Sequence, residues 1–172
     1  RDHIARADPA RQPHLATALA LSMDERWVLA TPEAMARRSL AFHRERFPLI
    51  LEDLLALPPT DLLLVEGFGL VPDLVAPLLV APEQAIWLLP TPAFRRAAIE
   101  RRGTLWSMPR ETSDPARALA NRLARDALLT EEIHRLARER GLRVLDVDGR
   151  TSLEQTAAQV ERWFAPRLAQ TQ

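Results

Sequence analysis

The chain alternates between short, continuous apolar runs and longer stretches in which apolar residues recur at helical spacing. Short apolar runs bounded by turn residues are typical of strands buried in a parallel sheet, and the longer stretches are typical of helices that cover such a sheet. Three runs predict strands, at residues 61–66, 85–89 and 143–148. Because these strands alternate with helices, the pattern predicts an α/β fold with a parallel sheet and right-handed crossovers.

Helix ends are marked as clearly as the strands. Thr31 and Pro32 predict a helix start, because threonine can cap the first turn and proline fits its first position. Gly141 is typical of a helix C-terminus, and Pro48 predicts a kink inside the first long helix. The predicted helices cover residues 13–22, 33–57, 72–79, 92–102, 114–141 and 152–164. We expect residues 1–172 to form a single domain.

The first predicted strand ends in Glu66 and Gly67. In an open parallel sheet, ligands bind outside the carboxyl ends of the strands, so Glu66 is expected at the mouth of a site. Gly67 would let the backbone turn tightly beside a ligand. The structural alternative is that Glu66 caps the next turn or pairs with an arginine.

The amino-acid composition limits the kinds of molecule that the protein is expected to bind. The 172 residues carry 23 basic and 23 acidic side chains, and every basic one is arginine. This balance provides no broad cationic face for nucleic acid or anionic lipid, although a local arginine pocket for phosphate is compatible with it. The longest apolar run, residues 74–80, is too short to cross a bilayer. The absence of cysteine excludes thiolate chemistry and fits a reducing cytoplasm.

The sequence lacks the characteristic motifs of several kinds of enzyme. The four histidines show no metal-ligand spacing, and the sequence contains no G-x-S-x-G elbow of a serine hydrolase. The absence of lysine excludes Schiff-base chemistry.

The order of these features resembles the P-loop kinases. A strand ending in Glu66 and Gly67 is followed by strand 85–89, an arginine-rich helix at 94–102, a loop, a long helix and the segment 145–149. Within the P-loop NTPase superfamily, this order is most similar to the nucleoside and nucleotide kinase-like group, and the resemblance covers roughly residues 33–165. It implies a three-layer fold in which helices flank a parallel sheet, and an AAA-type or kinase-like ATP-binding protein.

The same resemblance implies an activity and a set of site residues. The activity is the ATP-dependent transfer of a phosphoryl group to a small-molecule acceptor, with Mg²⁺ and a mobile lid, here residues 91–125. Glu66 matches the acid that helps to hold magnesium through water or orients the acceptor hydroxyl. Arg102 and Arg110 match lid arginines that face the transferring phosphate.

Further residues match groups that bind the nucleotide. Arg122 and Arg125 fall where the family places additional phosphate-facing groups, and Asp148 and Gly149 fall where its backbone wraps the adenine. Surface pairing along a long helix is an equal alternative for Arg122 and Arg125. A solvated helix face is likewise an alternative for most of the arginine-rich helix, since its arginines cannot all face one site.

The chain departs from the family in one respect. It contains no lysine and no G-x-x-x-x-G-K-[ST] phosphate loop, and it begins with Arg1. We therefore expect it to be the carboxyl part of a larger P-loop protein that lacks the first strand or strands. The alternative is a non-catalytic α/β module that serves as a scaffold or binds a partner through helices 33–57 and 114–141. Both alternatives are compatible with a homodimer.

Overall fold

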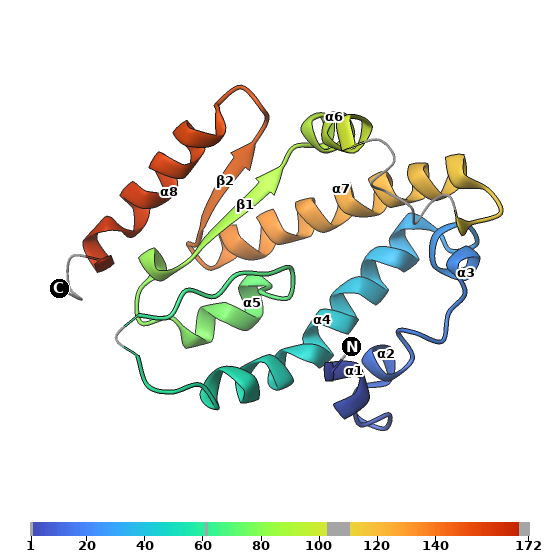
Figure 1. Cartoon of the computed structure of the whole chain (residues 1–172), viewed down its shortest axis with the longest axis horizontal. Coiled ribbons are helices and arrows are strands. Elements are labelled where there is room, and N and C mark those ends of the chain that lie inside the picture. Colours follow the sequence, from blue (N-terminus) through green and yellow to red (C-terminus); the bar gives the residue numbers. More distant parts are fainter. Residues whose placement is uncertain (1, 61, 103–110, 169–172) are drawn as a thin grey trace.

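The structure is a computed structural model that describes residues 2–60, 62–102 and 111–168, most of which lie in helices (Figure 1). Its elements, in chain order, are α1 (Asp2–Arg6), α2 (Pro13–Ala16), α3 (Met23–Trp27), α4 (Pro32–Leu55), α5 (Pro72–Val75), η1 (Ala76–Leu78), η2 (Pro82–Gln84), β1 (Ile86–Pro90), α6 (Pro92–Arg102), α7 (Pro115–Glu139), β2 (Arg143–Val147) and α8 (Leu153–Leu168).

Two long helices, α4 and α7, pack against each other (Figure 1). The helices α2, α3, α5 and α6 and the strand β2 each contact one of the two. Each of the two long helices begins at a capping residue followed by proline. The Thr31 hydroxyl accepts a hydrogen bond from the Ala34 backbone N–H at 3.3 Å, and the Asp114 carboxylate accepts one from the Arg117 N–H at 3.0 Å. Proline occupies the first position of both helices, where its missing N–H costs nothing.

The core surrounds this helix pair. Its buried apolar side chains come from α2, the loop before α4, α4 itself, the α5 region and α7, and they include Leu15, Val28, Met35, Phe47, Leu49, Val71, Ala118, Leu136 and Ala137. The short N-terminal helices are therefore held by packing against α4 and α7, as isolated helices of this length are not stable in water.

The sheet is small. β1 and β2 pair in parallel, from Ile86 opposite Arg143 to Pro90 opposite Val147. The α8 helix is joined to the sheet by Trp163, whose indole N–H donates to the Ala85 carbonyl at 3.2 Å. The Arg143 guanidinium lies 4.9 Å from the centre of the same indole ring.

The predicted three-layer parallel sheet of a P-loop kinase-like fold is wrong. Within residues 2–60, 62–102 and 111–168 the sheet has two strands, and these confirm the runs predicted at 85–89 and 143–148. Residues 62–66 form no strand and are exposed. A strand requires a neighbour that pairs with its N–H and C=O groups, and an apolar run by itself does not show whether that neighbour exists.

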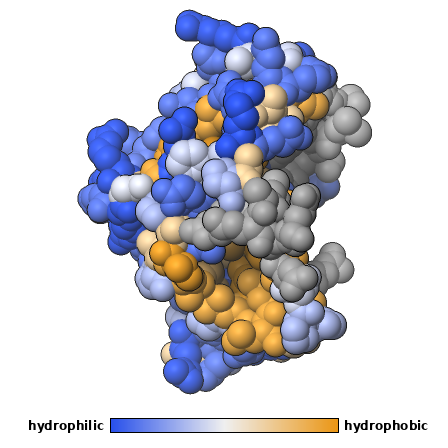
Figure 2. All heavy atoms as spheres, turned by 90° about the vertical axis from the view of Figure 1, so that its left-hand side faces the viewer, coloured by the Kyte–Doolittle hydropathy of each residue, from blue (hydrophilic) through white to orange (hydrophobic). Residues whose placement is uncertain are grey.

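Several apolar side chains remain on the surface. They include Leu64 at 80%, Phe68 at 92% and Val80 at 88% exposed. Figure 2 shows apolar side chains gathered around a hollow on the face that points to the left in Figure 1. None of the helices in the described part of the chain has both the length and the hydropathy needed to cross a membrane.

Candidate functional site

Three arginines converge on one buried carboxylate between α6 and α7. Arg95 Nη1 lies 3.0 Å from Asp126 Oδ2, Arg125 Nε lies 2.7 Å from Asp126 Oδ1, and Arg122 Nε lies 3.8 Å from Asp126 Oδ2. The Asp126 side chain is only 7% exposed. We call Arg95, Arg122, Arg125 and Asp126 the Asp126 cluster.

Helix geometry explains how the cluster assembles. Residues 125 and 126 lie three and four positions after Arg122 on α7, so each is a neighbour of Arg122 on the surface of that helix. Arg95 comes from the first turn of α6, where the Thr91 hydroxyl accepts a hydrogen bond from the Phe94 N–H at 3.3 Å. The start of α6 is thereby fixed against the end of β1.

The indole of Trp27 forms part of the surroundings. The guanidinium carbons of Arg122 and Arg125 lie 5.6 and 5.0 Å from the centre of its ring. Asn121 holds this region in place, since its side-chain amide donates to the carbonyl oxygens of Trp27 at 3.0 Å and Val28 at 3.3 Å. The aromatic face both attracts the two cations and excludes water from them.

Burial affects the electrostatics of the cluster. It lowers the pKa of Arg122 to about 10, while the negative charge of Asp126 acts in the opposite direction. Burial also lowers the pKa of Arg125, with Asp126 again opposing the change. Both side chains remain charged at neutral pH. The cluster thus holds three cations and one anion in a place where water solvates them poorly.

His43 lies close to these cations. Its burial, and then the positive charges of Arg46 and Arg125, lower the pKa of its imidazole to about 4. The ring is therefore neutral at pH 7 and adds no charge to this region.

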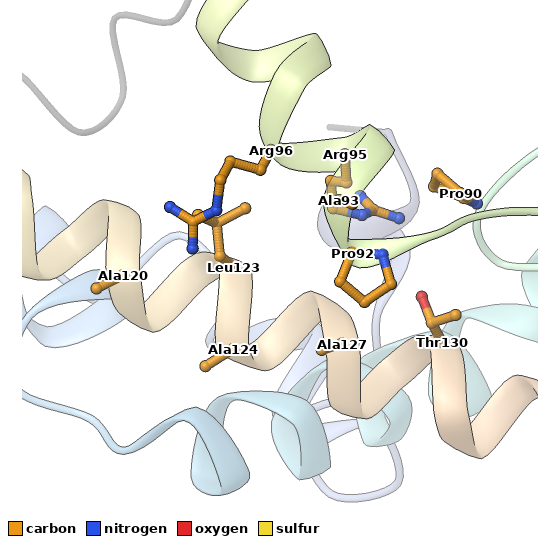
Figure 3. Close-up of a pocket in the computed structure, with 10 residues that line it drawn as sticks. All are labelled: Pro90, Pro92, Ala93, Arg95, Arg96, Ala120, Leu123, Ala124, Ala127 and Thr130. Carbon is orange, nitrogen blue, oxygen red and sulfur yellow. The ribbon is translucent and has the colours of Figure 1, made fainter. Parts of the chain in front are cut away.

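A groove of about 370 Å³ lies between α6 and α7 beside the cluster (Figure 3). Alanines of α7 form part of its lining, and Arg95 and Arg96 of α6 also line it. Arg95 belongs to both the groove and the Asp126 cluster. A second hollow of about 770 Å³ shares Pro92, Ala124, Ala127 and Thr130 with the groove and is also lined by Glu33, Glu131, His134 and Asp146.

The structure brings together two of the predicted site residues and adds a third arginine. Arg122 and Arg125 meet at Asp126, as part of one cluster and not as separate surface pairs. Arg95 reaches the same carboxylate across 31 positions of sequence, a contact that helical spacing alone could not reveal. Arg102 is the last residue of α6 and its side chain is not among those described, and Arg110 lies outside the described residues, so both stay predictions.

Glu66 and Gly67 lie in the exposed coil that precedes α5. The Glu66 carboxylate makes no hydrogen bond or ion pair with any described residue, so it does not cap the next turn or pair with an arginine there. Gly67 has a φ of +152°, a conformation that residues with a Cβ atom rarely adopt.

Asp148 and Gly149 form the turn after β2. The Asp148 carboxylate accepts a hydrogen bond from the Arg150 N–H at 2.9 Å. Gly149 has a φ of +82°, and a Cβ atom there would lie 2.6 Å from the Phe94 ring. The close approach that this glycine permits is therefore made to Phe94, and its predicted contact with adenine stays a prediction.

The number of candidate metal-binding side chains decides how a magnesium ion could be held. No group of three or more His, Cys, Asp or Glu side chains in the described ranges could hold a metal ion. A magnesium ion held by one carboxylate, phosphate oxygens and water needs no such group, and a single free carboxylate such as Glu66 fits that kind of binding.

Comparison with models of protein families, with curated proteins and with solved structures found no match to this chain.

Proposed function

We propose that the chain takes part in phosphoryl transfer from ATP to a small-molecule acceptor, and that the Asp126 cluster binds phosphate oxygens in that reaction. The observation that carries the proposal is the convergence of three partly buried guanidinium groups on one carboxylate. Guanidinium groups match the oxygens of phosphate in paired hydrogen bonds, which makes arginine the common residue for phosphate recognition.

The charge balance supports the same conclusion. The Arg122 and Arg125 side chains are 12% and 16% exposed, so water compensates little of their charge, and they share Asp126 with Arg95. A phosphate that entered would meet these guanidinium groups in a place of low polarity, where charge pairs are strongest. Arg95 would connect the bound phosphate with the groove, which leaves room for further parts of the ligand.

Glu66 is the residue that we expect to hold magnesium, through water or directly. Magnesium would neutralise charge on the phosphate groups, as it does in phosphoryl transfer generally. In the same proposal Arg102 and Arg110 approach the transferring phosphate, and Asp148 and Gly149 lie beside the adenine.

The test is the affinity for ATP, measured by isothermal titration at low ionic strength with wild type and two matched variants. Arg125→Gln should weaken binding by about tenfold or more, because a hydrogen bond to a charged group contributes about 1.5–3 kcal/mol. Arg135→Gln is the control, since Arg135 also lies on α7 but pairs with Glu132 and Glu139 of its own helix. Equal affinities in all three proteins, or no binding to wild type, would rule out the phosphate site.

The exposed apolar surface favours a second candidate, a module that binds a protein partner without catalysis. Leu64, Phe68 and Val80 are each at least 80% exposed, and large exposed apolar patches mark interaction sites. The two candidates differ at Glu66. The phosphotransferase proposal expects Glu66→Gln to remove the effect of magnesium on ATP affinity, whereas the partner-binding candidate expects the substitution to change nothing.

A further inference from the structure

The two hollows described above follow one face of α7. The groove beside the Asp126 cluster and the second hollow have four lining residues in common, Pro92, Ala124, Ala127 and Thr130. The lining positions 120, 124, 127, 131, 134 and 138 of α7 recur every three or four residues, so they lie along a single face of the helix. We call the two hollows together the α7 trough, and one elongated ligand can reach into both.

The two ends of the α7 trough carry opposite charge. Arg95 and Arg96 of α6 line the end beside the Asp126 cluster (Figure 3). The described lining of the other end carries three carboxylates and one guanidinium, from Glu33, Glu131, Asp146 and Arg138. Between the two ends, three of the four shared residues are apolar. The trough therefore matches a ligand with an anionic group at one end, an apolar middle and a cationic group at the other end.

The carboxylates of the acidic end suit an ammonium group. In the described part of the chain, the Glu131 carboxylate makes no hydrogen bond or ion pair, because Arg135 on the next turn pairs with Glu132 and Glu139 instead. No group of three or more His, Cys, Asp or Glu side chains in the described ranges could hold a metal ion, and this holds for the trough as well. An ammonium group has three N–H donors and can bind carboxylates that do not converge on one point.

We infer that the acceptor of the proposed phosphoryl transfer is an alcohol that carries a primary amine, and that its ammonium group binds at the Glu131 end of the α7 trough. The inference deepens the proposed function and rests on it, because the phosphate site at the Asp126 cluster fixes the other end of the ligand. Ala124, which lines the groove together with the arginines, lies seven positions before Glu131, or about 10 Å along the helix axis. The hydroxyl and the amine are therefore joined by a chain of about this length.

The transfer itself is balanced by ATP and water. The acceptor's hydroxyl oxygen bonds to the γ-phosphorus of ATP, and the bond from that phosphorus to the bridging oxygen breaks. ADP leaves, and the hydroxyl proton passes to water. The product is an aminoalkyl phosphate, which carries both of the charged groups that the trough matches.

The probe is 6-aminohexyl phosphate, the product that this reaction would give from 6-aminohexanol, and hexyl phosphate is the matched ligand that lacks only the amine. Both are titrated calorimetrically at low ionic strength and about pH 8, where an alkyl amine is still charged. Wild type should bind 6-aminohexyl phosphate about fivefold more tightly than hexyl phosphate, since one ammonium group would meet several partly exposed carboxylates.

Two matched variants place the effect in the trough. Glu131→Gln should lower the ratio of the two affinities about threefold and should not weaken binding of hexyl phosphate. Glu132→Gln is the control, because it makes the same change one position further along α7, at a residue that does not line the trough. The control should leave the ratio unchanged.

Equal affinities of wild type for the two ligands would overturn the inference, and so would the same ratio in wild type and Glu131→Gln. Arg125→Gln separates these failures from a failure of the phosphate site. If this variant weakens binding of ATP and of hexyl phosphate, the phosphate site stands, and equal affinities in wild type reject the amine-bearing acceptor alone. If wild type binds neither ATP nor hexyl phosphate, the phosphate site is wrong and the inference fails with it.

Discussion

At the scale of single residues, the position of a charge in the tertiary structure decides what it can do. Arg135 and Arg125 are the same residue type on the same helix. Arg135 is 51% exposed and pairs within α7, and such exposed pairs contribute little to stability. Arg125 is 16% exposed and lies beside a tryptophan ring and two other arginines. Only the second arrangement concentrates positive charge that a phosphate could use.

His43 provides a residue-scale prediction about pH. Its pKa is lowered to about 4 in the folded protein, so the unfolded chain binds the proton first as pH falls. Stability should therefore decrease as pH falls from about 6.5 to 4.5, by up to about 2 kcal/mol from this group. Chemical denaturation of wild type and His43→Leu at several pH values would measure this. The variant should show a flatter profile in this window, and identical profiles would contradict the prediction.

At the scale of elements, local capping signals specify where the two framing helices begin. Thr31 was predicted to cap its helix, and the predicted range 114–141 begins at Asp114; each side chain accepts a hydrogen bond from a first-turn N–H. Helix ends depend on residues that are neighbours in sequence, which is why α4, α6, α7 and α8 agree with their predicted ranges to within a few residues. The predicted helix at 13–22 is an exception, because α2 ends at Ala16.

The cap of α4 gives an element-scale prediction. Thr31→Ala removes the acceptor for the Ala34 N–H and should destabilise the protein by about 1 kcal/mol. Thr31→Ser keeps the hydroxyl and should leave the stability within about 0.5 kcal/mol of wild type. Urea denaturation of the three proteins compares their free energies of unfolding. A loss in Thr31→Ser as large as that in Thr31→Ala would show that the methyl group, and not the cap, matters.

At the scale of the whole molecule, a few contacts between distant segments hold the N-terminal helices on the α4–α7 pair. Asn121 on α7 is one of them, since its amide donates to the carbonyls of Trp27, Val28 and Ala30 more than 90 positions away in sequence. The same contact holds the Trp27 ring near Arg122 and Arg125. The stability of the N-terminal region and the geometry of the Asp126 cluster are therefore expected to be coupled.

Asn121→Ala tests whether this contact holds the N-terminal region in place. It leaves the carbonyls without their donor and should cost about 1–3 kcal/mol. Asn121→Asp keeps the size but removes the amide donor, so it should destabilise at least as much. Amide hydrogen exchange should quicken more in residues 22–30 than in α4. An equal change in both regions would show that the contact has no local role.

The sequence by itself determined the starts of α4, α6, α7 and α8, the two strands that pair and the arginines of α7, because caps, apolar runs and i, i+3 and i, i+4 spacing are set by neighbouring residues. The tertiary structure alone decided three further matters. It left residues 62–66 unpaired, since a strand exists only where a neighbour meets its backbone groups. It brought Arg95 to Asp126, and it set Gly149 against Phe94. Each of these depends on which distant segments meet, and local pattern carries no information about that.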